Sequence, residues 1–281
     1  MQKEIPKFDL PIDYVITDDI TEGLLNQYGR SPCKIKAEIF ILCTKGRIRA
    51  TINLAEYTIQ ANDFVTLLPD SFIQIHEVSP DIKLYVAAFS SGFVANFNTV
   101  VTVRCFYSII LSNPVISLSP SSVPVFAGVY AAFIASYQSF FLSLTGDIVK
   151  AILQLFTEAV CGIYQSYKSK INVPSGREYK ISQNFMQLVM EQYQKEHGLA
   201  YYAQRLKLTV PYLSGCVRKA IGRTATDIIS AVVVMDAKTQ LKFTDWPINR
   251  IAVSLGFENA SFFSKFFKKH TSMTPQEYRN C

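Results

Sequence analysis

The spacing of hydrophobic residues changes character along the chain. Between residues 35 and 90, short runs such as AEIFILC, RIRATINL and FIQIHEVS alternate apolar and polar positions and are separated by turn residues. A period of two is typical of half-buried antiparallel strands, and short strands with regular turns favour a small barrel or sandwich. This region is therefore predicted to form strands over about residues 35–90.

After about residue 118 the apolar positions follow a helical period instead. The run GDIVKAILQLFTEAVCGIYQSYKSK has apolar residues with this spacing at Ile148, Ile152, Leu155, Phe156 and Val160. Serines and prolines upstream, in SPSSVPVF, suit the start of an earlier helix. Two helices are predicted over about residues 118–168. Their apolar faces need a partner, and a dimer interface is one hypothesis for it.

The segment Val125 to Leu144 carries no formal charge over 20 residues, which is the length of a membrane-spanning helix. A polar run, Ser136 to Ser139, lies within it, and no basic cluster flanks it. We interpret the segment as a helix buried in the core or in a dimer interface, with a membrane helix as the alternative.

A linker is predicted before the carboxy-terminal third. The run KSKINVPSGREYK combines charges with proline, serine and glycine and has no periodicity. Beyond it, ISQNFMQLVMEQYQKEHG returns to helical spacing. The sequence thus predicts a multi-domain α and β protein, with an amino-terminal domain over residues 1–170, a linker over 171–180 and an all-helical domain over 181–281.

The helical domain contains an internal repeat. Residues Gly198–Gly222 and Pro247–Thr271 each have the pattern of a short helix, a tight turn and a second helix, with matching alanines about 49 residues apart. A small alanine lets two helices approach closely, which is the arrangement of a helix-turn-helix unit. Thr209 is the predicted N-cap of the second helix in the first copy, and Asn259 or Ser261 in the second copy.

Periodicity separates a buried stripe from an outward face on the second helix of each copy. Phe263 and Phe267 are assigned to the core, as Leu213 and Val217 are in the first copy, and Phe257 is expected to pack beneath them. Small, hydroxylated and basic residues on such a face can reach base edges and phosphates. The candidate DNA contacts are Pro211, Tyr212, Ser214, Gly215, Arg218, Lys219, Ala260, Ser261, Ser264, Lys265, Lys268 and Lys269. An amphipathic core helix with a solvated basic face is the alternative for either copy alone, and the repeat argues against it.

Charge is unevenly distributed between the two parts of the chain. Residues 195–281 carry 13 Lys+Arg and 6 Asp+Glu, a net charge of +7, and residues 1–194 carry 15 and 16, a net charge of −1. A basic domain on a neutral body favours a polyanionic partner, most commonly nucleic acid. A solvated lysine surface is the alternative that charge alone leaves open.

These residues resemble the carboxy-terminal signature of AraC/XylS-type transcriptional regulators. The matching runs are IA at residues 251–252, LGF at 255–257, FFSKFFKK at 262–269 and TPQEYR at 274–279, with YLSGCVRKAIG in the first copy. The resemblance covers about residues 181–281. It implies two helix-turn-helix units joined by a helix over about Thr224 to Leu241, with both recognition helices in successive major grooves on one side of double-stranded DNA.

The first recognition helix departs from this family pattern. Many members have arginine or another long side chain where this sequence has Gly215. We therefore expect the second helix to contribute more direct sequence discrimination, and Arg218 and Lys219 to bind phosphate. The amino-terminal domain resembles the family's cupin-type effector and dimerisation domain in the order of its elements, which implies a cupin-like β-barrel followed by two helices.

Catalytic chemistry is not expected. His76, next to Glu77, is the only histidine among the predicted strands, whereas a cupin metal site needs two or three histidines and a carboxylate. The sequence has no GxSxG, HExxH, Walker or GxGxxG motif, and its six cysteines are scattered with no CxxC pair. No enzyme activity, cofactor or metal is predicted. The amino terminus is too acidic for a secretion signal, so a cytoplasmic protein is expected.

The function that these features favour is sequence-specific, effector-responsive regulation of transcription. Double-stranded DNA is the predicted partner, with a homodimer, a small-molecule effector and RNA polymerase as further partners, and activation follows the family resemblance. A small apolar or sugar-like ligand fits a barrel interior, which side chains can equally fill. No membrane is expected. The alternative is an interaction or membrane-associated protein whose basic helices bind polyanions nonspecifically.

Overall fold

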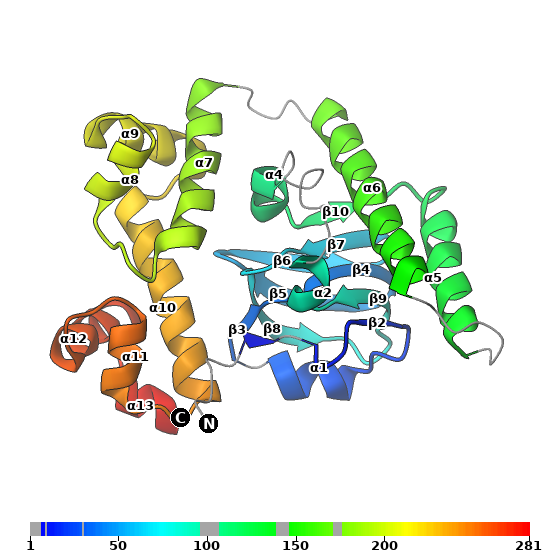
Figure 1. The fold of residues 1–281 in the computed structure, drawn as a ribbon, viewed down its shortest axis with the longest axis horizontal. Coiled ribbons are helices and arrows are strands. Elements are labelled where there is room, and N and C mark those ends of the chain that lie inside the picture. Colours follow the sequence, from blue (N-terminus) through cyan, green and yellow to red (C-terminus); the bar gives the residue numbers. More distant parts are fainter. Residues whose placement is uncertain (1–6, 9, 30, 96–106, 139–145, 171–175) are drawn as a thin grey trace. The chain divides into compact units, whose positions relative to one another are not determined.

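The chain divides into two compact units (Figure 1). The sheet unit comprises residues 8–30 and 35–173, and the helical unit comprises residues 1–7, 31–34 and 174–281. The computed structural model describes residues 7–8, 10–29, 31–95, 107–138, 146–170 and 176–281.

The strands form two five-stranded sheets, with the orders β1-β3-β8-β5-β6 and β10-β7-β4-β9-β2. The strands are β1 (Lys7–Phe8), β2 (Tyr14–Thr17), β3 (Cys33–Ile35), β4 (Glu38–Lys45), β5 (Arg47–Ile52), β6 (Ala55–Gln60), β7 (Asp63–Leu67), β8 (Phe72–Val78), β9 (Lys83–Phe89) and β10 (Val115–Ser117). Strands β4 to β9 confirm the predicted strand region, and β4 pairs antiparallel with both β7 and β9. The sheets are separate, so a closed cupin-like barrel is not confirmed. Alternation predicts half-buried strands, but it does not determine how sheet edges meet.

Five helices of the sheet unit are described. They are α1 (Glu22–Gly29), α2 (Ser91–Ala95), α4 (Tyr107–Ser112), α5 (Val123–Gln138) and α6 (Gly146–Lys170). The last two correspond to the predicted pair over about residues 118–168. The first three were not predicted, because helices this short carry too few turns to show a period.

Helices α5 and α6 cover one face of the second sheet with an aromatic core. Phe156 of α6 stacks on Phe40 of β4 with ring centroids 5.5 Å apart, and it lies 4.9 Å from the ring of Tyr130 of α5. The buried Tyr130 hydroxyl donates to the Phe40 carbonyl oxygen at 3.1 Å. The apolar faces of both helices therefore find their partner within the same chain.

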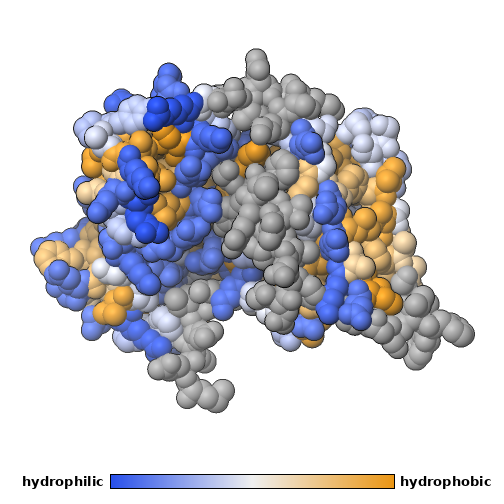
Figure 2. Space-filling view, turned by 45° about the horizontal axis from the view of Figure 1, so that its top comes forward, coloured by the Kyte–Doolittle hydropathy of each residue, from blue (hydrophilic) through white to orange (hydrophobic). Residues whose placement is uncertain are grey.

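Apolar side chains also remain on the outside of these helices. Val125 of α5 is 66% exposed, and Leu155 of α6, which the spacing assigned to the apolar face, is 47% exposed. Figure 2 shows such side chains at the surface around α5 and α6, on the right of the view. The Tyr130 side of α5 is thus buried in the core of the sheet unit, and burial of its other side in a dimer interface stays a prediction.

No helix in the described part of the chain combines the length and the apolar character that crossing a membrane requires. Helix α5 ends at Gln138, and residues 139–145, which include the end of the uncharged segment, lie outside the described residues.

The regular elements of residues 176–281 are all helical. They are α7 (Arg177–Gln192), α8 (Leu199–Arg205), α9 (Val210–Ile221), α10 (Ala225–Phe243), α11 (Ile248–Ser254), α12 (Ala260–Thr271) and α13 (Pro275–Asn280). Helix α7 begins inside the range predicted as a linker, because Gly176 is already its extended N-cap residue. Residues 171–175 of that range lie outside the described residues.

One carboxyl group makes the stability of the sheet unit depend on pH. Glu38 at the start of β4 is 6% exposed, and burial raises its pKa to about 7 from an ordinary value of 4.5. The folded chain therefore holds this proton over a pH range in which the unfolded chain releases it. The contribution of Glu38 to the free energy of unfolding is fully present below about pH 4.5, and it is lost as the pH rises through about 7.

Replacing Glu38→Gln should remove this loss. We expect the variant to be more stable than the parent at pH 8 by on the order of 3 kcal/mol and equal to it at pH 4. Urea unfolding followed by circular dichroism across this range measures the difference. Glu77→Gln, at an exposed carboxylate, is the control and should give no such gain. A constant difference between the parent and Glu38→Gln at all pH values would contradict the prediction.

Candidate nucleic-acid interface

Helices α8 and α9 form the first helix-turn-helix unit. The chain turns at Lys207, whose φ is 57°, and α9 starts from Thr209, whose side chain accepts from the Tyr212 amide at 3.4 Å. Leu213 and Val217, on the inner face of α9, are fully buried. The predicted cap and the predicted buried stripe are both confirmed.

Helices α11 and α12 form the second unit. The turn contains Gly256 with a φ of 78°, and Asn259 is the N-cap, because its side-chain oxygen accepts from the Ser261 and Phe262 amides at 3.0 Å each. Of the two candidate caps, Asn259 is therefore the one used. Phe263 and Phe267 are fully buried, as predicted.

Most of the phenylalanines near α12 belong to the core. The Phe257 ring packs on Phe263 with centroids 5.4 Å apart and on His197 at 4.7 Å, and Phe266 stacks on His197 at 6.4 Å. Phe262 is the exception, with 58% of its surface exposed. His197 lies in the connection between α7 and α8. This aromatic group therefore joins the second helix-turn-helix unit to the segment that precedes the first. Burial lowers the pKa of His197.

A buried hydrogen-bond network holds α10 between the two helix-turn-helix units. The Asp236 carboxyl accepts from the Tyr193 hydroxyl at 2.8 Å, from Gln194 Nε2 at 2.9 Å and from Gln240 Nε2 at 3.2 Å. The Gln240 side-chain oxygen in turn accepts from the Ser254 hydroxyl of α11 at 2.8 Å. Asp236 and Gln240 have no exposed surface. One network therefore joins the end of α7, the middle of α10 and the end of α11.

Residues 31–34 extend this network within the helical unit. The Lys34 Nζ donates to the Tyr193 hydroxyl at 3.0 Å, and the Thr239 hydroxyl donates to the Pro32 carbonyl oxygen at 2.7 Å. These residues were not predicted from the sequence. The available signal was Asp236 and Gln240, four apart, on a helix whose other inward positions are apolar except for Thr239.

The candidate DNA contacts lie outside the core. The exposed ones are Pro211, Tyr212, Gly215, Arg218, Lys219, Ser261, Lys265, Lys268 and Lys269, and the partly buried ones are Ser214, Ala260 and Ser264. Two of them contact α7: Lys219 Nζ lies 3.0 Å from Glu178 Oε1, and the Arg177 guanidinium lies 5.9 Å from the centre of the Tyr212 ring. The other candidates on α9 and α12 offer a basic and hydroxylated surface.

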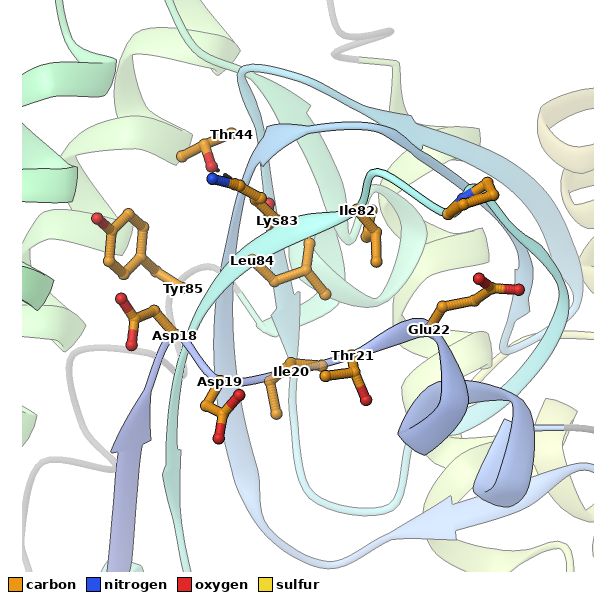
Figure 3. Close-up of a pocket in the computed structure, with 11 residues that line it drawn as sticks. Asp18, Asp19, Ile20, Thr21, Glu22, Thr44, Ile82, Lys83, Leu84 and Tyr85 are labelled. Carbon is orange, nitrogen blue, oxygen red and sulfur yellow. Dashed lines mark hydrogen bonds between the residues drawn. The ribbon is translucent and has the colours of Figure 1, made fainter.

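The sheet unit has a hollow of about 380 Å³ between the segment that precedes α1 and strand β9 (Figure 3). Asp18, Asp19 and Glu22 line it together with Lys83 and Tyr85. The described residues contain no group of three or more His, Cys, Asp or Glu side chains placed to hold a metal ion. Elsewhere in this unit, His76 Nε2 lies 2.7 Å from the Thr51 hydroxyl oxygen across β8 and β5, which is a hydrogen-bonding role.

A family model described as a helix-turn-helix domain matches residues 202–280. Residues 202–280 are an AraC/XylS-type helix-turn-helix domain. This confirms the family resemblance read from the sequence. The matched range begins inside α8 and contains the rest of both helix-turn-helix units and the α10 helix between them.

Relatives of the AraC/XylS-type domain have names that describe regulators. An uncharacterized HTH-type transcriptional regulator, YtdP, of Bacillus subtilis is 32% identical over 39% of this chain and 14% of its own length. The melibiose operon regulatory protein of Escherichia coli is 28% identical over 39% of this chain and 36% of its own length. The chain thus matches well under half of either relative. A solved structure of unsaturated fatty acid bound ToxT from Vibrio cholerae is 15% identical over 98% of this chain and 97% of that one, with a TM-score of 0.46.

The turn of the second unit in this AraC/XylS-type domain requires glycine. A Cβ on Gly256 would meet the Gln194 carbonyl oxygen at 2.5 Å, in a backbone conformation that other residues rarely adopt. Gly256→Ala should therefore lower the free energy of unfolding by more than about 1 kcal/mol. Urea unfolding followed by the fluorescence of Trp246, the single tryptophan, reports on the helical unit.

Gly215→Ala is the matched control. It lies inside α9, and a Cβ there would meet nothing within 4 Å. This change should raise stability by about 0.5–1 kcal/mol, because alanine loses less conformational entropy than glycine in a helix. Equal effects of the two substitutions would contradict a specific requirement at Gly256.

Proposed function

We propose that the protein is a sequence-specific DNA-binding transcriptional regulator that uses both helix-turn-helix units of its AraC/XylS-type domain. The buried Asp236 network supports this most directly, because it joins α10 to the end of α7 and to α11. It thereby gives the two helix-turn-helix units one fixed separation. Two recognition helices at a fixed separation suit successive major grooves of one duplex. The net charge of +7 over residues 195–281 supplies attraction to phosphate.

The two recognition helices divide the work unequally in this proposal. Ser264 and Lys265 on α12 present a hydroxyl and an amine to base edges, whereas Ser214 and Gly215 on α9 present less. Arg218 and Lys219 on α9 and Lys268 and Lys269 on α12 bind phosphate and set the register of the domain on DNA. Pro211, Tyr212, Ala260 and Ser261 complete the contact surface.

The sheet unit is proposed as a cupin-like sensing and dimerisation domain of a cytoplasmic activator. Exposed apolar residues such as Val125 and Leu155 support a contact with a second copy. An effector acts by binding one arrangement of the DNA-binding domains more tightly than another. RNA polymerase is then a further partner of the activator at its promoter.

In vitro selection from a random duplex pool tests this function. The full-length protein should enrich one motif at near-physiological salt, with two half-sites about one helical turn, or about 10.5 bp, apart. Enrichment of no motif, together with binding that disappears as salt rises, would contradict the proposal and favour a nonspecific polyanion-binding surface.

Substitutions on the two recognition helices should affect discrimination differently. Ser264→Ala and Lys265→Ala should each reduce preference for the selected motif by about 1–3 kcal/mol per lost base contact, and Ser214→Ala should change it little. Lys268→Ala should weaken binding to all sequences and lower the salt slope by about 1. Fluorescence anisotropy with matched and mismatched duplexes measures these quantities. Loss of discrimination in Ser214→Ala but not in Lys265→Ala would reverse the assignment of the two helices.

A further inference from the structure

The first turn of α7 contacts one face of the first recognition helix. Glu178 and Lys219 form a hydrogen-bonded ion pair at 3.0 Å, and the Arg177 guanidinium lies 5.9 Å from the centre of the Tyr212 ring. Tyr212 and Lys219 are seven residues apart, which is about two helical turns, so they lie on the same face of α9. Both residues are among the candidate DNA contacts predicted from the sequence, and no residue of α7 is.

The ion pair is accessible to solvent and to a competing anion. The side chains of Lys219 and Glu178 are 73% and 39% exposed. The hydrogen bond from Lys219 lowers the pKa of Glu178, and the same contact raises the pKa of Lys219, so both groups carry charge at neutral pH. Exposed pairs of this kind are weak in water, and a phosphate oxygen can take the place of the carboxylate.

We infer that Glu178 competes with the DNA phosphodiester backbone for Lys219, and that the first turn of α7 thereby sets the affinity of the first helix-turn-helix unit. This inference rests on the proposed function. In the free protein the Lys219 ammonium is paired with the Glu178 carboxylate. When DNA binds, a phosphate takes the place of that carboxylate. Arg177, beside Tyr212, acts in the opposite direction and adds a positive charge to the same edge.

The competition acts equally on all sequences. Phosphate contacts carry no direct sequence information, so Glu178 lowers affinity for the selected motif and for unrelated DNA by the same factor. Any change that moves the start of α7 away from α9 frees Lys219. The first turn of α7 is therefore a point at which the affinity of the domain can be adjusted without altering its base contacts.

Affinity measurements on the full-length protein test this inference. Anisotropy titrations would use a duplex with the selected motif and an unrelated duplex, at salt concentrations from about 50 to 200 mM. Glu178→Gln should bind both duplexes about 3–10-fold more tightly at the lower salt, with a salt slope steeper by about one. Adding Lys219→Ala should abolish this gain. Glu191→Gln removes the same charge from the far end of α7, where Glu191 contacts Gln187, and should leave affinity unchanged.

Several outcomes would overturn the inference. They are an unchanged affinity in Glu178→Gln while Lys219→Ala weakens binding, a gain that persists in the double variant, and an equal gain in Glu191→Gln. Thermal unfolding of each variant shows whether it is folded, and Glu178→Ala provides a second route to the same carboxylate deletion. Failure of the parent protein to bind any duplex in a salt-dependent manner would instead overturn the proposed function and this inference with it.

Discussion

The arrangement of the helical unit depends on one buried side chain in the middle of α10. Asp236 has no exposed surface and accepts hydrogen bonds from Tyr193, Gln194 and Gln240. A buried polar group costs free energy if it loses its partners, so α7, α10 and α11 are held in the one arrangement that satisfies all of them. The apolar contacts of α10 allow close packing, but the network selects which packing occurs. The separation of α9 and α12 follows from this constraint.

The two helix-turn-helix units meet the same geometric demands with different residues. The turn after the first helix needs a positive φ, which Lys207 adopts in one unit and Gly256 in the other. At Gly256 the Gln194 backbone comes so close that a side chain is excluded, whereas the first turn tolerates lysine. The recognition helices also end in the left-handed region, at Gly222 and Ser272. The same backbone turns are therefore made by different residues in the two copies.

Local features of the sequence were sufficient to predict most of the helical unit. The buried stripe that includes Phe263 and the Thr209 cap follow from spacing and capping over a few residues, and the helix from about Thr224 was implied by the family resemblance. The Asp236 network and the Lys34 contact could not be predicted in this way, because they join residues up to 159 positions apart. The sheet order and the buried Glu38 depend in the same way on which strands pair. Pairing is decided by nonlocal packing, which no short window of sequence reveals.

In the proposed function, one rigid helical unit places two recognition helices on the same side of DNA. Hydroxyl-radical footprinting of the full-length protein on its selected duplex tests this most directly. We expect two protected segments whose centres are about one helical turn, or about 10.5 bp, apart on one face of the duplex. A single protected segment, or two segments on opposite faces, would contradict it, because the fixed separation of α9 and α12 permits neither.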